Sequence, residues 1–348
     1  MNKISKKLVH WYHIKSYDFP WRKSKNVYDI WISEIMLQQT QVKTVLAYYN
    51  KWIDVFPNIQ ILANAKIEHV LKLWEGLGYY QRAHNIHKTA QIVMNEYNGK
   101  FPSSFSALLK LAGIGDYTAS AIMSIAYHKP YPAIDGNLKR VVARLYGIDN
   151  FKNITAKSKE HVQDLMYKYN PSEINQALMD LGREVCLPKK PHCTACPVKI
   201  SCYAKKNNAV HKFLNKNKTI TKPIYNVAVG MIWKNDKILI SKRKNDGLLG
   251  GLWELPGGKK INKESFSECL QREIYEELNI EVKINKTIGY IKHQYSHFGI
   301  NMKGYHCQFH SGIPKAIESD EIKWISLNEI KKYPFPKSTL KIFSLAGC

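Results

Sequence analysis

The chain has 348 residues, enough for about two domains at roughly 150 residues each. Hydrophobic residues make up 45% of it and aromatic residues 11%, which excludes a disordered protein and allows a core in each domain. Residues 1–20 lack the features of a signal peptide, and no apolar run approaches the roughly 20 residues that cross a bilayer. We therefore expect a soluble cytoplasmic protein with no membrane partner. Its net charge of +24 points to a polyanionic partner.

The positive charge is spread along the chain, with +12 over residues 1–204, +6 over 205–222 and +6 over 223–348. Both halves are therefore expected to contact nucleic acid. Residues 205–222 are polar and basic and contain no acid, which is typical of a linker. We predict a helical domain over 1–204, a basic linker over 205–222 and a second domain over 223–348.

The first half of the chain predicts helices in short succession. Apolar residues recur with helical spacing over Tyr28–Val55 (one or two helices), Ile67–Leu73, Ala83–Tyr97, Phe105–Leu111, Tyr117–Tyr127 and Leu138–Tyr146. Gly147 is expected to end the last of these. Gly113 and Gly115 lie between two of the helices and predict a tight hairpin.

The second half has a different pattern. Strand-like runs occur at Asn226–Trp233, Lys237–Lys242, Ile284–Tyr290, Met302–Phe309 and Ile322–Ile325. A strong helix is predicted over Ser265–Asn279. The fold class is therefore a multidomain chain, in which an all-α domain precedes a mixed α/β domain.

Four of the seven cysteines crowd into one short stretch. Cys186, Cys193, Cys196 and Cys202 have the spacing C-x6-C-x2-C-x5-C. Such a cluster indicates metal ligands rather than disulfides in a reducing compartment. Four thiolates can hold zinc or an iron–sulfur cluster, and the spacing alone does not choose between them.

The glycine hairpin has a possible role in binding DNA. Backbone amides at Gly113, Gly115 and the start of the next helix can grip one phosphate, since glycine allows close approach. The structural alternative is a plain turn between helices. Asp135 likewise has two readings that are compatible, because it lies where a helix N-cap is expected.

Taken together, the hairpin, Asp135 and the cysteine spacing resemble the helix–hairpin–helix DNA glycosylases of the endonuclease III and MutY group. The resemblance implies a [4Fe–4S] cluster on the four cysteines, with a structural and DNA-orienting role. It implies that Asp135 faces the sugar, where a carboxylate stabilises the positive charge that develops at C1′.

Residue 117 separates the subfamilies of this group. Bifunctional relatives carry a lysine there, whose amine attacks C1′ and leads to strand cleavage. Tyr117 cannot form a Schiff base, so we predict that it takes part in a monofunctional catalytic site. An endonuclease III-like lyase is the alternative, and it lacks the lysine it needs.

Glu34 is the only charged residue between Asp29 and Lys43. Desolvation in so apolar a helix should raise its pKa, as a general acid working near neutrality requires. An exposed glutamate on a helix face is the alternative. Gln39 and Thr40, which follow in a polar run, supply groups that can pair with base edges.

The string of residues 33–42 closely resembles the signature of MutY-type adenine DNA glycosylases. The resemblance implies that Glu34 protonates the adenine leaving group while Asp135 stays ionised, a division of labour found in glycoside cleavage. Further matches imply substrate contacts at Trp21, Arg22, Leu77, Tyr79, Asn137, Asp180, Tyr295, Ser296 and His297. Leu77 and Tyr79 match a loop that wedges into the base stack. Asp180 stands where the family has a glutamate, one methylene longer.

The second domain contains a sequence that resembles a Nudix box, from Gly258 to Glu277. Glu273, Glu276 and Glu277 are expected on one helix face, where they could bind Mg²⁺ for pyrophosphate hydrolysis. A solvated helix face is the alternative. In MutY enzymes a Nudix-related domain recognises 8-oxoguanine, and Tyr295–His297 resembles the loop that senses this base.

The resemblance extends from about Trp21 to His297. It implies a base excision repair glycosylase that acts as a monomer at the nucleoid. Its partner would be double-stranded DNA with A:8-oxoguanine or A:G mispairs, from which it flips and hydrolyses adenine. The alternatives are the lyase, an added or separate Nudix nucleotide diphosphatase, and an iron–sulfur DNA-binding module without catalysis.

Overall fold

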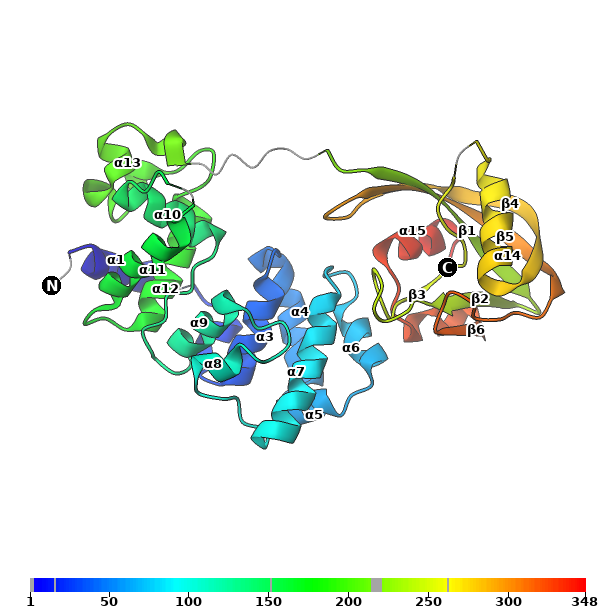
Figure 1. Ribbon diagram of the computed structural model, residues 1–348, viewed down its shortest axis with the longest axis horizontal. Helices are drawn as coiled ribbons and strands as arrows, with labels where there is room; N and C mark the ends of the chain where they lie inside the picture. Colours follow the sequence, from blue (N-terminus) through cyan, green and yellow to red (C-terminus); the bar gives the residue numbers. More distant parts are fainter. Residues whose placement is uncertain (1–2, 16, 151, 214–220, 262) are drawn as a thin grey trace. The chain divides into compact units, whose positions relative to one another are not determined.

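The computed structural model describes residues 3–15, 17–150, 152–213, 221–261 and 263–348 (Figure 1). Their contacts divide the chain into two compact units. The helical unit combines Met1–Asn64 with Asn85–Lys218, and the sheet unit combines Ala65–His84 with Thr219–Cys348. The chain therefore enters the sheet unit twice. No helix in the described part is long and apolar enough to span a membrane.

The helical unit confirms the all-α prediction for this part of the chain. Its α-helices are α1 (Lys3–Lys15), α2 (Pro20–Lys23), α3 (Val27–Leu37), α4 (Val42–Val55), α5 (Ile59–Ala63), α7 (Gln81–Tyr97, from residue 85), α8 (Phe105–Leu108), α9 (Asp116–Ile125), α10 (Gly136–Tyr146), α11 (Ile154–Met166), α12 (Pro171–Asp180) and α13 (Tyr203–Lys206). A π-helix, η1 (Leu181–Val185), follows α12, and η2 (Cys193–Ala195), η3 (Lys199–Ser201) and η4 (Val210–Phe213) are 3₁₀ turns.

The stretch Tyr28–Val55 forms two helices rather than one. Gln39, with φ 55°, interrupts the helical backbone between α3 and α4. The predicted helix Phe105–Leu111 is shorter than expected and ends at Leu108. Gly147 ends α10 in a left-handed conformation with φ 75°, as predicted, because glycine adopts it without a steric penalty.

The start of the predicted linker is folded, which corrects that interpretation for residues 205–213. Ala209 and Phe213 are buried in the core that α10, α11 and α12 share with α1. The many lysines of this segment suggested an exposed linker, but its few apolar side chains are enough to bury part of it. Residues 214–220 of the predicted linker lie outside the described residues.

The sheet unit confirms the mixed α/β prediction. Its elements are α6 (Ile67–Trp74), β1 (Ile224–Lys234), β2 (Lys237–Lys242), β3 (Trp253–Glu254), α14 (Phe266–Leu278), β4 (Ile280–Gln294), β5 (Gly299–Gly312), β6 (Glu321–Ile325), η5 (Leu327–Lys332) and α15 (Lys337–Leu345). The described strands form one sheet in the order β3-β2-β1-β5-β4, with β6 also paired to β2. β1 and β5 run parallel, whereas the other pairs are antiparallel.

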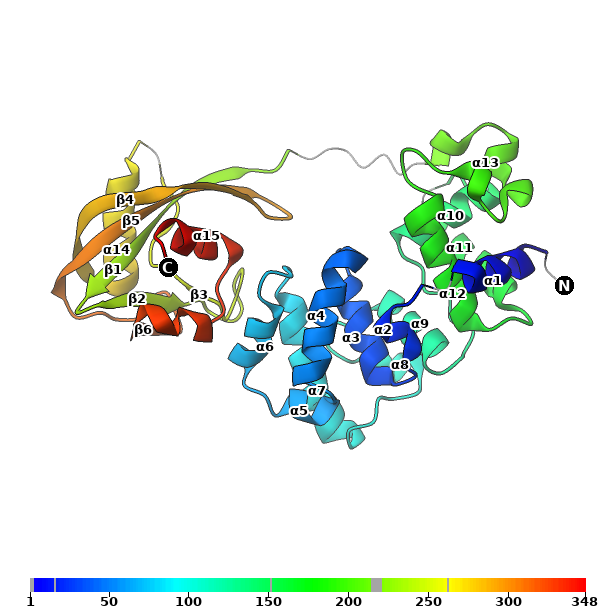
Figure 2. The ribbon, with the colours of Figure 1, turned by 180° about the vertical axis from the view of Figure 1, so that it is seen from behind.

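The two faces of this sheet are covered by different helices (Figure 2). Along β1, Val229 and Met231 join the core beneath α15, whereas Ala228 and Ile232 join the core beneath α14. This alternation follows from the two-residue period of a strand. A capping box at Ser265 starts α14, and Asn279 ends it in a left-handed conformation, so the helix predicted there is confirmed.

Candidate active site

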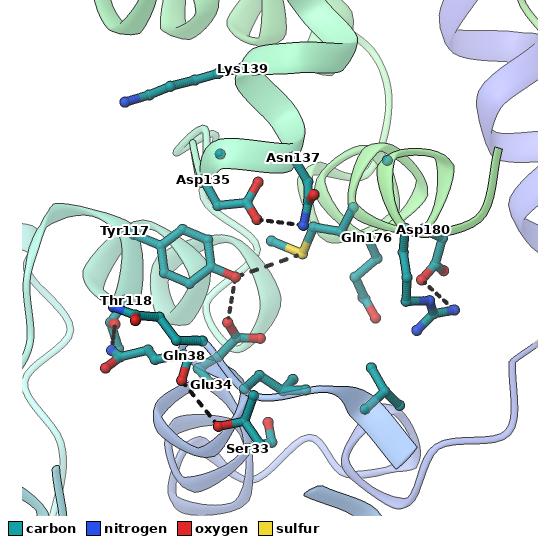
Figure 3. A pocket seen from close by; sticks show the side chains of 18 of the residues that line it. Ser33, Glu34, Gln38, Tyr117, Thr118, Asp135, Asn137, Lys139, Gln176 and Asp180 are labelled. Atoms are coloured by element: carbon teal, nitrogen blue, oxygen red, sulfur yellow. Dashed lines mark hydrogen bonds and ion pairs between the residues drawn. The ribbon is translucent and has the colours of Figure 1, made fainter. Parts of the chain in front are cut away.

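A cleft with a volume of about 1560 Å³ lies in the helical unit. Side chains from α3, α9, α10 and α12 line it, and they face one another across the opening (Figure 3). Of the residues predicted from the sequence, the cleft brings together Trp21, Arg22, Glu34, Gln39, Thr40, Gly115, Tyr117, Asp135, Asn137 and Asp180. They come from segments far apart in the chain, and a shared cleft is the expected arrangement of a ligand site.

Glu34 is a buried acid at this cleft. Its side chain is on α3 and the residue is 5% exposed, as its apolar neighbours predicted. The Tyr117 hydroxyl, from α9, donates a 2.8 Å hydrogen bond to Oε2 of Glu34. Burial raises the pKa of Glu34 to about 7, although the bond from Tyr117 opposes the shift. A carboxyl group with this pKa can hold a proton close to neutral pH.

Asp135 is a half-buried carboxylate that caps α10. Its Oδ1 accepts a 2.7 Å hydrogen bond from the backbone N–H of Leu138, and Oδ2 accepts one of 3.1 Å from Nδ2 of Asn137. Burial raises the pKa of Asp135, and these two donors oppose the rise because they favour the ionised form. The N-cap interpretation and a place at the cleft therefore both apply.

Arg140 joins Asn137 to the cysteine-rich loop. Nη2 of Arg140 donates to Oδ1 of Asn137 at 2.9 Å and to the carbonyl of Gly182 at 2.7 Å. Nε of Arg140 donates to the carbonyl of Cys186 at 2.8 Å. A continuous set of hydrogen bonds thus runs from Asp135 to the first cysteine of the loop. The sequence analysis missed Arg140, because an arginine one helical turn after Asn137 carries no signal of its own.

Asp180 lies at the cleft as predicted, but its carboxylate is engaged by two arginines. Arg22 donates to both oxygens, at 2.7 and 2.8 Å, and Arg183 lies 3.1 Å from Oδ1. The Arg22 guanidinium also lies over the ring of Phe19 at 5.1 Å. Trp21 is buried, 5.2 Å from the same ring in a stacked arrangement. Bidentate pairing of this kind holds side chains in fixed positions.

Two backbone features line or border the cleft. Gln39 is exposed in a left-handed conformation, and the hydroxyl of Thr40 donates to the carbonyl of Gln38 at 3.3 Å. In the hairpin, Gly113 has φ +74°, and a Cβ there would lie 2.7 Å from Cβ of Asn85. Gly115 is the N-cap residue of α9, which leaves the first amides of that helix available.

Three of the four cysteines of the loop, Cys186, Cys196 and Cys202, pack against the helical core. Arg144, 1% exposed, donates to the carbonyls of Leu187 and Pro188 at 2.8 Å each and to Sγ of Cys186 at 3.3 Å. Burial raises the pKa of Cys196 to about 12, and the charges of Cys186, Cys193 and Cys202 add to the rise. The other three cysteines therefore lie close enough to Cys196 to act on it, although the raised pKa opposes the thiolate form that an inorganic group would take.

In the sheet unit, the predicted Tyr295–His297 segment is the turn between β4 and β5. The Tyr295 ring stacks on Phe298 at 4.9 Å, and its hydroxyl lies 2.8 Å from Oγ of Ser338. Ser296 and His297 are exposed. The turn therefore exposes the polar side chains of Ser296 and His297 beside the stacked rings of Tyr295 and Phe298.

Leu77 and Tyr79 also belong to the sheet unit. Leu77 is 6% exposed, whereas Tyr79 is half-buried, with the Arg82 guanidinium 5.5 Å from its ring centre. The helical cleft does not include either residue among those that line it. The side chain of Tyr79 is therefore more accessible to DNA than that of Leu77.

The acids of the Nudix-like box do not form a metal site in the described residues. Arg272 donates to Glu273 and to Glu276 at 2.9 Å each, and Glu277 accepts from the backbone N–H of Gly257 at 3.3 Å. No three His, Cys, Asp or Glu side chains of the described residues, the four cysteines included, converge on a position for one metal ion. The expectation of Mg²⁺ at these three glutamates is therefore not supported.

Comparisons with known proteins assign two families to successive parts of the chain. Residues 32–168 match the HhH-GPD superfamily base excision DNA repair protein family, and residues 228–345 match the NUDIX domain family. The structure of a thermostable thymine-DNA glycosylase aligns with a TM-score of 0.55 and 28% identity, over 59% of this chain and 95% of that one.

Relatives named adenine DNA glycosylase align over both units. The one from Buchnera aphidicola subsp. Baizongia pistaciae is 39% identical over 295 residues, which are 83% of this chain and 82% of the relative. The one from Homo sapiens is 28% identical over 398 residues, which are 97% of this chain and 72% of the relative. On this identity and coverage, the chain belongs to the adenine DNA glycosylase family.

Proposed function

We propose that the protein hydrolyses the N-glycosidic bond of adenine in double-stranded DNA, at sites where adenine is paired with 8-oxoguanine or guanine. The observation that carries the proposal is the buried Glu34, whose pKa is raised to about 7 and which meets Tyr117 and Asp135 at one cleft. Family membership supports adenine as the base. The mispair partner rests on the resemblance of the sheet unit to a domain that recognises 8-oxoguanine.

In the proposed reaction, Glu34 and Asp135 have different roles. Protonated Glu34 gives its proton to the departing adenine, which is a poor leaving group as an anion. Ionised Asp135 stabilises the positive charge that develops at C1′ as the bond breaks. Glu34, now ionised, can take a proton from the attacking water. The raised pKa of the first group and the hydrogen bonds to the second support this assignment.

The protein is proposed to be monofunctional. Tyr117 occupies the position of the lysine that forms a Schiff base in bifunctional relatives, and its hydroxyl donates to Glu34. Burial holds the pKa of Tyr117 well above its ordinary value, so the hydroxyl stays protonated. Borohydride should therefore trap no covalent adduct between protein and DNA. A trapped adduct would assign the lyase function instead.

The four cysteines are proposed to hold a [4Fe–4S] cluster. The spacing of the four cysteines and the hydrogen bond from the buried Arg144 to Sγ of Cys186 support this proposal. Such a cluster, when bound, would supply crosslinks between four points of the loop. Arg144 would hold the loop in place for it, and Arg140 would connect the loop to Asn137 and Asp135.

DNA binding is proposed to use both units, with the hairpin amides at Gly113 and Gly115 on a phosphate and the turn Tyr295–His297 at the partner base. We place the protein, as a monomer, at the nucleoid in the cytoplasm. In this proposal the helical unit excises the base, and the sheet unit, which includes residues 65–84, recognises its partner. Because binding depends on phosphate contacts, affinity should fall with salt on a log–log slope near −0.9 per neutralised phosphate.

The decisive experiment compares the native protein with Glu34→Gln on duplexes that carry one A:8-oxoguanine pair. Alkali after the reaction cleaves the strand where adenine was released. Native protein should give cleavage, whereas the variant should bind the duplex and release adenine about 10² to 10⁴ times more slowly, the range for loss of a general acid. Equal rates for the two proteins would refute the proposed role of Glu34.

A further inference from the structure

The sheet unit carries a segment that lies far from it in the sequence. We propose that Glu75 is a positioning residue that fixes residues 76–80, the wedge loop, to the sheet unit. Recognition of the partner base would then be coupled to insertion of the wedge loop into the base stack. This inference rests on the proposed function and deepens it, because it assigns mispair specificity to a contact within the sheet unit, whereas Glu34 and Asp135 belong to the helical unit.

The contact consists of a partly buried ion pair that also satisfies backbone groups. Nζ of Lys72 donates to both carboxylate oxygens of Glu75, at 3.0 and 2.9 Å. The same Nζ donates to the carbonyl of Tyr333 at 2.8 Å, and Oε1 of Glu75 accepts from the backbone N–H of Phe335 at 2.7 Å. Since the Glu75 side chain is 16% exposed, solvent screens these bonds less than it screens a surface pair.

Residues 333–335, which form hydrogen bonds with Lys72 and Glu75, are themselves fixed within the sheet unit. Phe335 is fully buried in the core beneath α15, and the backbone N–H of Trp253 donates to the carbonyl of Pro334 at 2.8 Å. Residues 333–335 are therefore bonded on one side to β3 and on the other to Glu75. The position of α6 relative to the sheet follows from this double attachment.

Other contacts attach the same segment at both of its ends. Lys242 of β2 forms an ion pair with Glu68 near the start of α6. Nε2 of His84 lies 2.9 Å from the carbonyl of Gly250. A Cβ at Gly251 would lie 3.1 Å from Cδ1 of Leu71, so a larger residue there would crowd the contact. Residues 68–84 are thus held along their length.

The wedge loop has a preformed shape. Gly76, Gly78 and Tyr79 have φ values of 93°, 78° and 50°, all in the left-handed region. Side chains hold this backbone: Nε1 of Trp74 and Nη2 of Arg82 donate to the carbonyl of Gly78 at 3.0 and 3.1 Å. Because these bonds fix the loop backbone, we expect the wedge loop to keep a constant position relative to Glu75.

The chemistry of the loop suits insertion between bases. The half-buried ring of Tyr79 has a cation, Arg82, on one face, and such ring–cation pairs stack on nucleobases. The position of the wedge loop depends on the position of the sheet unit to which it is attached. The turn Tyr295–His297 belongs to the same unit. Binding of the partner base by the turn would therefore also place the wedge loop beside the mispair.

The experiment measures adenine release under single-turnover conditions from A:8-oxoguanine and A:G duplexes. It compares native protein, Glu75→Leu, Glu75→Gln and the control Glu281→Gln, which removes an exposed carboxylate of β4 that accepts from Ser311. Glu75→Leu removes the acceptor of the Phe335 N–H and the carboxylate partner of Lys72, whose Nζ keeps its bond to the carbonyl of Tyr333. Glu75→Gln keeps an oxygen for Phe335 but loses the charge. Amide exchange at Phe335 and in residues 76–80 reports the contact without any chemistry.

We expect Glu75→Leu to lower the ratio of the two rates, 8-oxoguanine over guanine, by about tenfold, as loss of a buried acceptor implies. Amide exchange at Phe335 should speed up in parallel, Glu75→Gln should restore part of the ratio, and Glu281→Gln should match the native protein. A native ratio in Glu75→Leu with faster exchange at Phe335 would overturn the inference. No adenine release by native protein from either duplex would instead refute the proposed function.

Discussion

The hydroxyl of Tyr117 donates a 2.8 Å hydrogen bond to the carboxylate of Glu34, although 83 residues separate them in the chain. The bond joins α9, which follows the glycine hairpin, to α3. Burial raises the pKa of Glu34 to about 7, and the bond from Tyr117 opposes part of that rise. The tyrosine therefore sets the pH range in which the acid keeps its proton.

Removal of this hydroxyl should move the pH profile of adenine release toward alkaline pH. The reaction needs protonated Glu34, so the native rate falls as pH rises above about 7. Tyr117→Phe removes a bond that favours the ionised form, which raises the pKa of Glu34 and shifts the descending limb to higher pH. Single-turnover rates between pH 5 and 9 test this.

Tyr127→Phe is the matched control for that series. Its hydroxyl donates to the carbonyl of Phe101 at 3.0 Å, in the same unit but outside the residues that line the cleft. Its descending limb should coincide with that of the native protein. A limb that stays in place or moves to lower pH in Tyr117→Phe would contradict the proposed tuning.

The buried acid should also lower stability at neutral pH. The pKa of Glu34 is 4.5 in an ordinary setting and about 7 in the fold, so the folded state binds the extra proton between these values. Its stabilising effect is complete below about pH 4.5 and is lost as pH rises through 7. Glutamine cannot ionise, so Glu34→Gln should gain about 3 kcal/mol over the native protein between pH 4.5 and 8.

Urea unfolding of both proteins across this range measures the difference. Glu96→Gln, which removes an exposed carboxylate of α7, controls for the loss of a charge. A gap between Glu34→Gln and native protein that does not widen with pH would show that Glu34 is not held protonated by burial.

The sequence analysis found the acids but not their surroundings. Glu34 was predictable because it is the only charged residue between Asp29 and Lys43, and Asp135 because it lies at a helix start. The bond from Tyr117 and the arginine pair on Asp180 were not, since contacts between distant segments leave no periodic pattern in either segment. Arg22 was expected to contact substrate, and the structure pairs it with Asp180.

The fold was predictable to a similar degree. The periods of 3.6 and 2 residues gave the all-α and α/β halves, and Gly147 and Ser265 marked helix ends through local chemistry. The helices α1 and α15 were missed. So was the grouping of residues 65–84 with the sheet unit, because it depends on single bonds such as Lys72 to Tyr333.

Arg140 should matter for the rate rather than for DNA binding. Its three hydrogen bonds, to Asn137, Gly182 and Cys186, hold the side chain that donates to Asp135. Arg140→Met removes them all, so Asn137 is no longer held in place and Asp135 keeps only its bond from the Leu138 N–H as a fixed contact. Single-turnover adenine release should therefore slow by about tenfold. Lys139→Met removes the neighbouring cation of the cleft and should weaken duplex affinity instead. Equal effects of both variants on affinity alone would contradict the assignment.

The sheet unit should not hydrolyse nucleoside triphosphates. Arg272 forms ion pairs with Glu264, Glu273 and Glu276. Its guanidinium would have to move away before Mg²⁺ could bind Glu273 and Glu276. Burial raises the pKa of Glu277 to about 8, so near neutrality that carboxyl is mostly protonated, a form that binds Mg²⁺ poorly. Native protein with 8-oxo-dGTP and Mg²⁺ should release no more pyrophosphate than Glu277→Gln, and Mg²⁺-dependent release above that baseline would assign the unit a second activity.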